Sequence, residues 1–134
     1  MIAGILRRIR DITLFLDPCA ASYARLGCQK APRYITWSSE NRSQLIRVPA
    51  TDPGKRRMEL RSPDPTANPY LAFALLIRAG MEGVREQLPL TKSTDCNLFT
   101  APREITDGLE RLPASLQEAI DLANASCFVR SCLP

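Results

Sequence analysis

The chain has 134 residues, 45% of them hydrophobic, and its 18 lysine and arginine residues outnumber 14 acidic residues to give a net charge of +4. This length sets a limit of one domain, and the hydrophobic content is enough for a core, which excludes a chain that is disordered throughout. The chain contains no histidine, which excludes histidine-based catalytic triads, histidine-ligated zinc and imidazole acid–base catalysis.

The positive charge leaves two classes of partner open. A modest excess of cations suits a small anionic ligand as well as it suits nucleic acid. Few aromatic residues lie among the arginines, so the sequence lacks the stacking surface with which proteins bind single strands. A small basic nucleic-acid binder remains an alternative that depends on charge alone, and we expect no nucleic-acid partner.

Cysteine usage and the length of apolar runs indicate the compartment. The cysteines are Cys19, Cys28, Cys96, Cys127 and Cys132. Their odd number and the lack of any Cys-x-x-Cys pair favour reduced thiols in a cytoplasmic protein over a disulfide framework or a zinc site. Arg7, Arg8 and Arg10 interrupt the opening apolar residues too early for a signal peptide. No run approaches the ~20 apolar residues of a membrane span, so we expect no membrane partner.

The first half of the chain predicts one helix followed by three strands. Apolar residues recur at helical spacing over residues 2–15, with arginines on the opposite side. Residues 19–32 have the composition of a loop. Extended segments follow at 33–38, 43–48 and 57–61, with turn residues between them. Their short connections predict an antiparallel meander.

The third of these strands has an alternating pattern. Arg57, Glu59 and Arg61 share one face of an extended segment, and Met58 and Leu60 share the other. Guanidinium groups bind phosphate and carboxylate oxygens through paired hydrogen bonds, and a carboxylate can bind a hard cation. This face therefore has the composition of a binding site. A surface strand with a solvated charged face is the alternative that the pattern leaves open.

The second half of the chain predicts two more helices, over residues 68–86 and 115–125. Asn68 can cap the first, with Pro69 at its first position. Apolar residues around most of its circumference indicate a buried helix that covers the sheet. Ser115–Glu118 is a capping box at the start of the second. Together the elements predict an α+β fold, with antiparallel strands packed under helices.

Two stretches carry a resemblance to a known family. They are WSSENRSQLIRVPA, over residues 37–50, and MELRSPDPTANPYLAFALL, over residues 58–76. Both closely resemble the C-terminal part of the catalytic domain of glutamine synthetase. The resemblance runs from about Ile2 to about Leu133 and is weakest over residues 17–33 and in the tail. It implies that residues 1–134 are a fragment of one catalytic domain, without the N-terminal domain and the first half of the catalytic domain.

The resemblance implies roles for six side chains. Arg42, Arg47 and Arg57 are similar to the family arginines that hold the phosphates of ATP. Arg42 also matches a catalytic arginine that reaches the transferred phosphoryl group and the glutamate substrate. The remaining implied roles are glutamate binding for Arg25 and Arg61 and metal coordination for Glu59.

The sequence departs from the family pattern at several positions, among them Lys30 and Phe99. Residues 27–32 align with a mobile flap in which the family usually has a glutamate before Ala-Pro, and Lys30 occupies that position here. A cation cannot act as an anionic base or attract ammonium. Phe99 occupies the position of a tyrosine that some bacterial relatives modify by adenylylation. Without a hydroxyl there is no acceptor, so we expect no such modification at Phe99.

The resemblance implies an ATP-dependent ligase, located in the cytoplasm, that forms glutamine from glutamate and ammonia through γ-glutamyl phosphate. It implies ATP as co-substrate and Mg²⁺ or Mn²⁺ as the metal. Phosphoryl transfer from ATP to glutamate brings anions together, and fixed cations and a divalent metal must offset their repulsion. Most of the family's metal ligands lie outside this chain, so we expect the isolated chain to be inactive. The alternative is a truncated or degenerate, non-catalytic member that folds, self-associates and binds anions.

Overall fold

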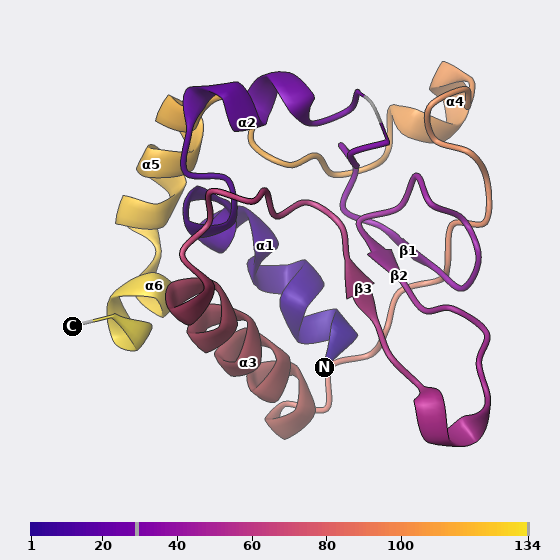
Figure 1. Ribbon diagram of the computed structural model, residues 1–134, viewed down its shortest axis with the longest axis horizontal. Coiled ribbons are helices and arrows are strands. Elements are labelled where there is room, and N and C mark those ends of the chain that lie inside the picture. Colours follow the sequence, from indigo (N-terminus) through magenta and orange to yellow (C-terminus); the bar gives the residue numbers. More distant parts are fainter. Residues whose placement is uncertain (29, 134) are drawn as a thin grey trace. The chain divides into compact units, whose positions relative to one another are not determined.

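The computed structural model describes residues 1–28 and 30–133, and it confirms an α+β fold over these residues (Figure 1). In chain order the elements are α1 (Ile2–Leu16), α2 (Ala20–Arg25), β1 (Trp37–Ser38), β2 (Ile46–Arg47), the 3-10 helix η1 (Pro53–Lys55), β3 (Glu59–Leu60), α3 (Pro69–Arg85), α4 (Arg103–Thr106), α5 (Leu116–Ala125) and α6 (Cys127–Cys132). The three predicted helices correspond to α1, α3 and α5, and their bounds agree within two residues. Sequence reasoning missed the short helices α2, α4 and α6.

The chain divides into two compact units, each built from separate stretches of sequence. Unit 1 comprises Met1–Tyr23, Pro63–Thr91 and Pro113–Pro134, and unit 2 comprises Ala24–Ser62 and Lys92–Leu112. Unit 1 contains the three long helices, and unit 2 contains the strands. No helix in the described part of the chain has the length and apolar character needed to cross a membrane.

Helix α1 provides the core of unit 1. Its apolar stripe, formed by Ile5, Ile9, Ile12 and Leu16, is fully buried, and burial of each side chain stabilises the fold by roughly 1.5–3 kcal/mol. Helices α3 and α5 both pack against this helix. The predicted amphipathic character of residues 2–15 is therefore confirmed.

Helices α1 and α3 cross with their backbones in contact. A Cβ added to Gly4 would lie 2.1 Å from the carbonyl oxygen of Ala79 and 2.7 Å from the backbone nitrogen of Gly83. Gly83 has the reciprocal constraint, because a Cβ there would lie 2.6 Å from the nitrogen of Gly4. Only glycine fits at these two positions, so they fix where the two helices cross.

The starts of the long helices confirm the predicted caps. Asn68 Oδ1 accepts a hydrogen bond from the backbone nitrogen of Tyr70 at 3.0 Å, and Pro69 takes the first helical position of α3. Ser115 Oγ accepts from the nitrogen of Glu118 at 3.2 Å at the start of α5. These bonds satisfy donors that a helix end otherwise leaves without a partner.

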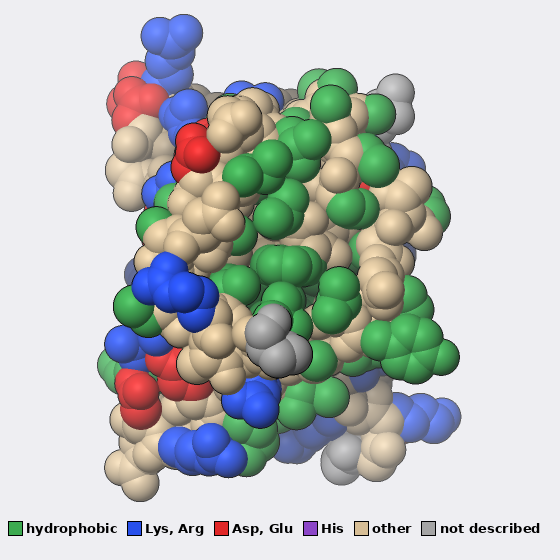
Figure 2. Space-filling view, turned by 90° about the vertical axis from the view of Figure 1, so that its left-hand side faces the viewer, with side chains coloured by type: hydrophobic (Ala, Val, Ile, Leu, Met, Phe, Trp, Pro, Cys, Tyr) green, Lys and Arg blue, Asp and Glu red, His purple; other side chains and the backbone are tan. Residues whose placement is uncertain are grey.

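Helix α3 is less buried than its composition indicates. One face packs in unit 1 through Ala72, Leu75 and Ala79. The opposite face is exposed and carries large apolar side chains, which we call the α3 stripe: Tyr70 (85% exposed), Phe73 (64%), Ile77 (56%) and Val84 (48%). Figure 2, which looks at the side where α5 and α6 lie in Figure 1, shows hydrophobic side chains gathered on the surface that it presents. The prediction of a buried helix therefore fails for half of its circumference.

Unit 2 contains a three-stranded sheet in the order β1-β2-β3. Ile46 in the central strand pairs with Trp37 on one side and Leu60 on the other. Leu45 and Ile46 are fully buried, so the central strand forms the core of this unit. Each strand has only two residues, shorter than the predicted segments 33–38, 43–48 and 57–61.

The prediction of an antiparallel meander is correct for β2 and β3 but wrong for β1 and β2, which run parallel. Residues 39–45 form a loop instead of a hairpin turn. Asn41 Oδ1 accepts from the backbone nitrogen of Ser43 at 2.9 Å, and Gln44 Nε2 donates to the carbonyl of Cys96 at 2.8 Å. These bonds hold the chain in a loop that brings it back to the beginning of β1, so β2 then runs in the same direction.

Candidate active site

The pairing of β2 with β3 assembles a charged cluster in unit 2. Arg47 lies opposite Glu59 in the register of the two strands, and its Nη1 is 3.1 Å from Glu59 Oε2. Arg57 Nε lies 3.3 Å from the other carboxylate oxygen, Oε1. The hydrogen bond from Arg47, and secondarily that from Arg57, hold the pKa of Glu59 below its ordinary value. The structure thus confirms that Arg57 and Glu59 share a face, as the alternating pattern predicts.

Arg61 extends this cluster from the end of β3. Its backbone nitrogen donates to the carbonyl of Leu45 at 2.9 Å, which fixes its position beside the central strand. Burial lowers the pKa of Arg61, and the positive charges of Arg42 and Arg47 lower it further. Its Nη1 is buried and has no hydrogen-bond partner among the described residues. A buried guanidinium donor without a partner is costly, and an anion would satisfy it.

The two other predicted arginines also lie in unit 2. Arg25 donates from Nη2 to the carbonyl of Ser62, the residue that follows Arg61. Arg42 lies on an exposed turn that Asn41 closes through its side chain. Unit 2 therefore contains all five predicted arginines together with Glu59. Arg42, Arg47 and Arg61 are close enough for their charges to interact.

Sequence reasoning missed the residues beside Arg47. Glu40 accepts from Arg47 Nε through its backbone carbonyl at 3.1 Å and lines a cavity of about 400 Å³ together with Ser38 and Asp95. Ser38 Oγ donates to Asp95 Oδ1 at 2.5 Å, and this bond, with one from Ser93, lowers the pKa of Asp95. Ser38 and Asp95 are far apart in sequence, and no local pattern joins them.

A complete divalent-metal site is not formed by these residues. Mg²⁺ and Mn²⁺ take about six oxygen ligands. Among the described residues there is no group of three or more acidic, cysteine or histidine side chains that could hold a metal ion. Glu59 offers one carboxylate, which two arginines already contact. The residues present therefore do not fit the metal by themselves, and Glu59 can supply one ligand at most.

The predicted flap forms a tight turn. Its Gln29 lies outside the described residues. The backbone nitrogen of Gly27 donates to the carbonyl of Ala31 at 3.1 Å, and a Cβ on Gly27 would lie 2.4 Å from Arg33 Nε. Lys30 is exposed and has a positive φ of 71°, a conformation that favours glycine or asparagine. The lysine therefore projects from the turn into solvent.

Phe99 lies in a second turn of unit 2. Its backbone nitrogen donates to Asn97 Oδ1 at 3.0 Å, and its ring is partly exposed beside Tyr34 and Ser43 in a cavity of about 190 Å³. The absence of adenylylation at this position stays a prediction.

The fold and the charged cluster of unit 2, which we call the arginine cluster, define a class of protein. It is a small α+β module in which arginines beside the strands surround one carboxylate. The family model described as "Glutamine synthetase, catalytic domain" matches residues 1–134. The chain therefore belongs to the glutamine synthetase catalytic-domain family, as the resemblance predicts.

Known relatives extend this comparison. The chain is 47% identical to a glutamine synthetase of Methanosarcina mazei over 98% of this chain and 30% of the relative. It is 40% identical to the enzyme of Clostridium saccharobutylicum over 90% of this chain and 28% of the relative. A solved structure described as a GmaS/ADP complex in conformation 1 has a TM-score of 0.84 and 28% identity, covering 99% of this chain and 31% of that one. The chain thus spans less than a third of these relatives.

Proposed function

We propose that this chain supplies the arginine-rich part of the active site of an ATP-dependent glutamate–ammonia ligase. The observation that carries the proposal is the buried Nη1 of Arg61, which has no hydrogen-bond partner in the described structure, beside the charges of Arg42 and Arg47. Such a concentration of positive charge is unfavourable by itself and is relieved by a bound anion. The ADP named in the description of the GmaS complex supports a nucleotide as one of these anions.

In the proposed reaction, the γ-carboxylate of glutamate attacks the terminal phosphorus of ATP. One P–O bond forms, the bond to ADP breaks, and the product is an acyl phosphate. Ammonia then displaces phosphate to give glutamine. Arg47 and Arg57 hold the phosphates of ATP, Arg42 contacts the transferred group, and Arg25 and Arg61 bind glutamate. Fixed guanidinium groups lower the repulsion between these anions without reorganising during the reaction.

The metal enters this proposal only through Glu59. In the complete enzyme Glu59 would supply one oxygen ligand to Mg²⁺ or Mn²⁺, and the metal would contribute charge neutralisation. Binding would replace the contacts that Arg47 and Arg57 now make with this carboxylate. A cytoplasmic location is part of the same proposal and agrees with five free cysteines.

A nucleotide titration tests the anion site directly. Adding ATP to the ¹⁵N-labelled chain should shift amide signals within residues 42–61. Arg42→Gln should weaken binding about five-fold, the value of one ion pair at an accessible site. Arg103→Gln removes the same charge from an exposed residue of α4 and should change nothing. Equal weakening by both variants would mean that ATP responds to net charge, and the proposed site would be wrong.

Catalysis by the isolated chain is not expected, because the described residues do not form a metal site. Phosphate release that depends on both glutamate and ammonia should stay at background. Such release, lost in Glu59→Ala, would contradict this expectation.

The alternative is a non-catalytic member that folds, self-associates and binds anions, and Lys30 in place of the flap glutamate favours it. Co-expression distinguishes the two functions. This chain is expressed together with the part of the Methanosarcina mazei relative that it does not match. Glutamine formation by the reconstituted protein, increased by Lys30→Glu, would support the ligase. Anion binding without turnover in either form would support the alternative.

A further inference from the structure

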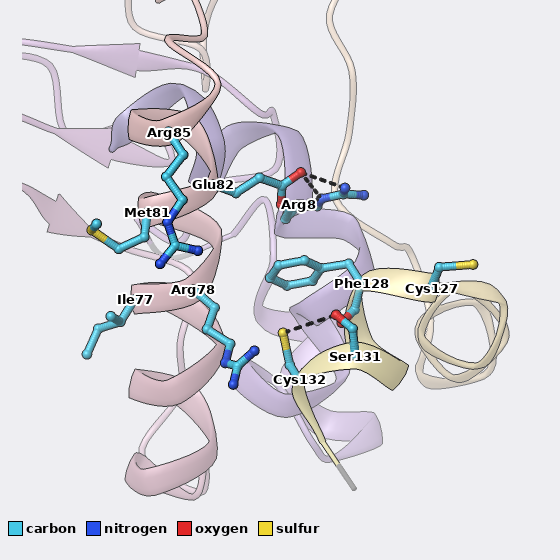
Figure 3. Close-up of a pocket in the computed structure, with 10 residues that line it drawn as sticks. All are labelled: Arg8, Ile77, Arg78, Met81, Glu82, Arg85, Cys127, Phe128, Ser131 and Cys132. Carbon is cyan, nitrogen blue, oxygen red and sulfur yellow. Dashed lines mark hydrogen bonds and ion pairs between the residues drawn. The ribbon is translucent and has the colours of Figure 1, made fainter.

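A second charged cavity lies within unit 1, between α3 and α6 (Figure 3). Its volume is about 650 Å³, within the roughly 300–1,000 Å³ of sites that hold small ligands. Residues of α1, α3 and α6 line it, among them Arg8, Arg78, Glu82, Arg85 and Phe128. Three arginines and one glutamate give the lining a net charge of +2.

Glu82, the one acidic residue among the described residues of the lining, is already neutralised. Arg8 donates from Nε to Glu82 Oε2 at 2.9 Å and from Nη2 to Oε1 at 2.6 Å, a paired geometry that is stronger than a single ion pair. The guanidinium of Arg8 also lies 5.0 Å from the centre of the Phe128 ring. Arg7 also lies 3.5 Å from Glu82 Oε1, and Arg8 Nη1 lies 3.4 Å from Asp11 Oδ2. Arg8 and Glu82 are therefore the centre of a small ion-pair network beside the aromatic ring.

Arg78 and Arg85 have no counter-charge among the residues that the structure describes. They are two helical turns apart on α3 and therefore share a face. Both line the cavity, and Figure 3 shows the guanidinium group of Arg78 reaching toward α6. Neither makes an ion pair or hydrogen bond with any residue that the structure describes. Glu86, which follows the last residue of α3, pairs with Arg7.

We propose that this cavity binds a small amphipathic anion. Arg78 and Arg85 hold its phosphate or carboxylate group, and its flat apolar body packs on Phe128. Guanidinium pairs match the oxygens of such groups, and an aromatic ring offers apolar area at low entropic cost. The site is distinct from the arginine cluster of unit 2 in sequence and in residues, so the proposal is independent of the ligase function.

The test uses phenyl phosphate as the probe, with inorganic phosphate and benzyl alcohol as its charged and apolar halves. Each is titrated into the ¹⁵N-labelled chain. Phenyl phosphate should shift amides within residues 77–85 and 127–132 and should bind at least about five-fold more tightly than either half, since the two contacts act together. Shifts confined to residues 42–61 would overturn the proposal.

Variants test which residues contact the charged half of the ligand and which contact its apolar half. Arg78→Gln and Arg85→Gln should each weaken phenyl phosphate about five-fold, and Arg103→Gln should leave it unchanged. Phe128→Leu should reduce the affinity for phenyl phosphate to that for inorganic phosphate, without changing the latter. Because Arg78 and Arg85 are exposed and bond to no described residue, their loss should not affect folding, and matched thermal unfolding curves verify this. If all four variants bind phenyl phosphate with equal affinity, Arg78 and Arg85 are solvated surface residues and the cavity is not a binding site.

Discussion

At the scale of single residues, the Arg8–Glu82 pair connects stability to pH. Hydrogen bonds from Arg8 hold the pKa of Glu82 below its ordinary value of 4.5. Because the folded-state pKa is the lower one, the stability gained from this pair is complete above the ordinary pKa. It is lost as the pH falls through the lower folded-state value.

The Glu82→Gln variant should therefore lose about 1–2 kcal/mol of unfolding free energy at pH 7. Its difference from the parent chain should shrink below pH ~4, where the parent's carboxylate also becomes neutral. Denaturant unfolding at pH 7, 5 and 3.5 measures this. Glu104→Gln, at an exposed position of α4, is the control and should show no such trend. A constant difference across the three pH values would refute the pair's role.

Tyr23 gives a second prediction at the scale of single residues, in which stability is lost as the pH rises. Its hydroxyl is buried and has no hydrogen-bond partner among the described residues. Burial, followed by the charges of Asp17 and Asp64, raises the pKa of Tyr23 above its ordinary value of 10.0. Here the folded-state pKa is the higher one. The contribution of Tyr23 to folding stability is therefore complete below pH ~10 and is lost as the pH rises above that value.

Replacing Tyr23 with Phe should raise the unfolding free energy by up to about 1 kcal/mol, because a desolvated hydroxyl without a partner is removed. The variant should also lose less stability than the parent between pH 9 and 11. Tyr70→Phe is the matched control, since Tyr70 is 85% exposed. Destabilisation of Tyr23→Phe at neutral pH would show that the hydroxyl has a partner, such as an ordered water.

At the scale of elements, the crossing of α1 and α3 depends on the absence of side chains. Gly4→Ala should destabilise the chain by roughly 2–4 kcal/mol, because the new methyl group meets backbone atoms that cannot move independently. Gly80→Ala, in the partner helix α3, is the control. Its Cβ would meet only the flexible end of Met1, at 3.0 Å, so the change should lie within about 1 kcal/mol and favour the variant. Thermal unfolding of both variants decides the comparison, and equal effects would contradict it.

The elements also show which structural features the sequence can predict. Periodic apolar stripes define α1, α3 and α5, and capping residues such as Asn68 and Ser115 mark their starts, because both depend on nearby residues. The direction of β1 relative to β2 depends on bonds such as Gln44 to Cys96. That bond spans 52 residues, and no local pattern encodes it.

The same distinction holds for the candidate site. The shared face of Arg57 and Glu59 follows from the alternation of side chains along a strand, so the sequence predicts it. The pairing of Arg47 with Glu59 depends on the register between two strands, and the place of Asp95 beside Ser38 depends on tertiary packing. Residue roles came from family resemblance, since spacing alone allows a solvated charged strand equally well.

At the scale of the whole molecule, the α3 stripe predicts self-association. Its exposed apolar residues recur along one face of a helix, which is the pattern of an interface. Sedimentation velocity at increasing concentration should show dimers or larger species. Phe73→Lys should shift the distribution toward monomer, because it introduces a charge within the stripe.

Phe99→Lys introduces the same charge at a partly exposed phenylalanine of unit 2 and controls for net charge. If both variants dissociate the chain equally, repulsion between copies is responsible and the stripe is not the interface. If neither does so while association persists, another surface is responsible.

The interleaving of the two units along the chain has a consequence for recombination between homologous genes. The polypeptide passes between unit 1 and unit 2 four times, at residues 23–24, 62–63, 91–92 and 112–113. A single crossover between two homologous genes within this region therefore gives a chimaera with mixed parentage in at least one unit. We expect functional chimaeras to require crossovers close to all four junctions, so that each unit keeps residues that were selected together.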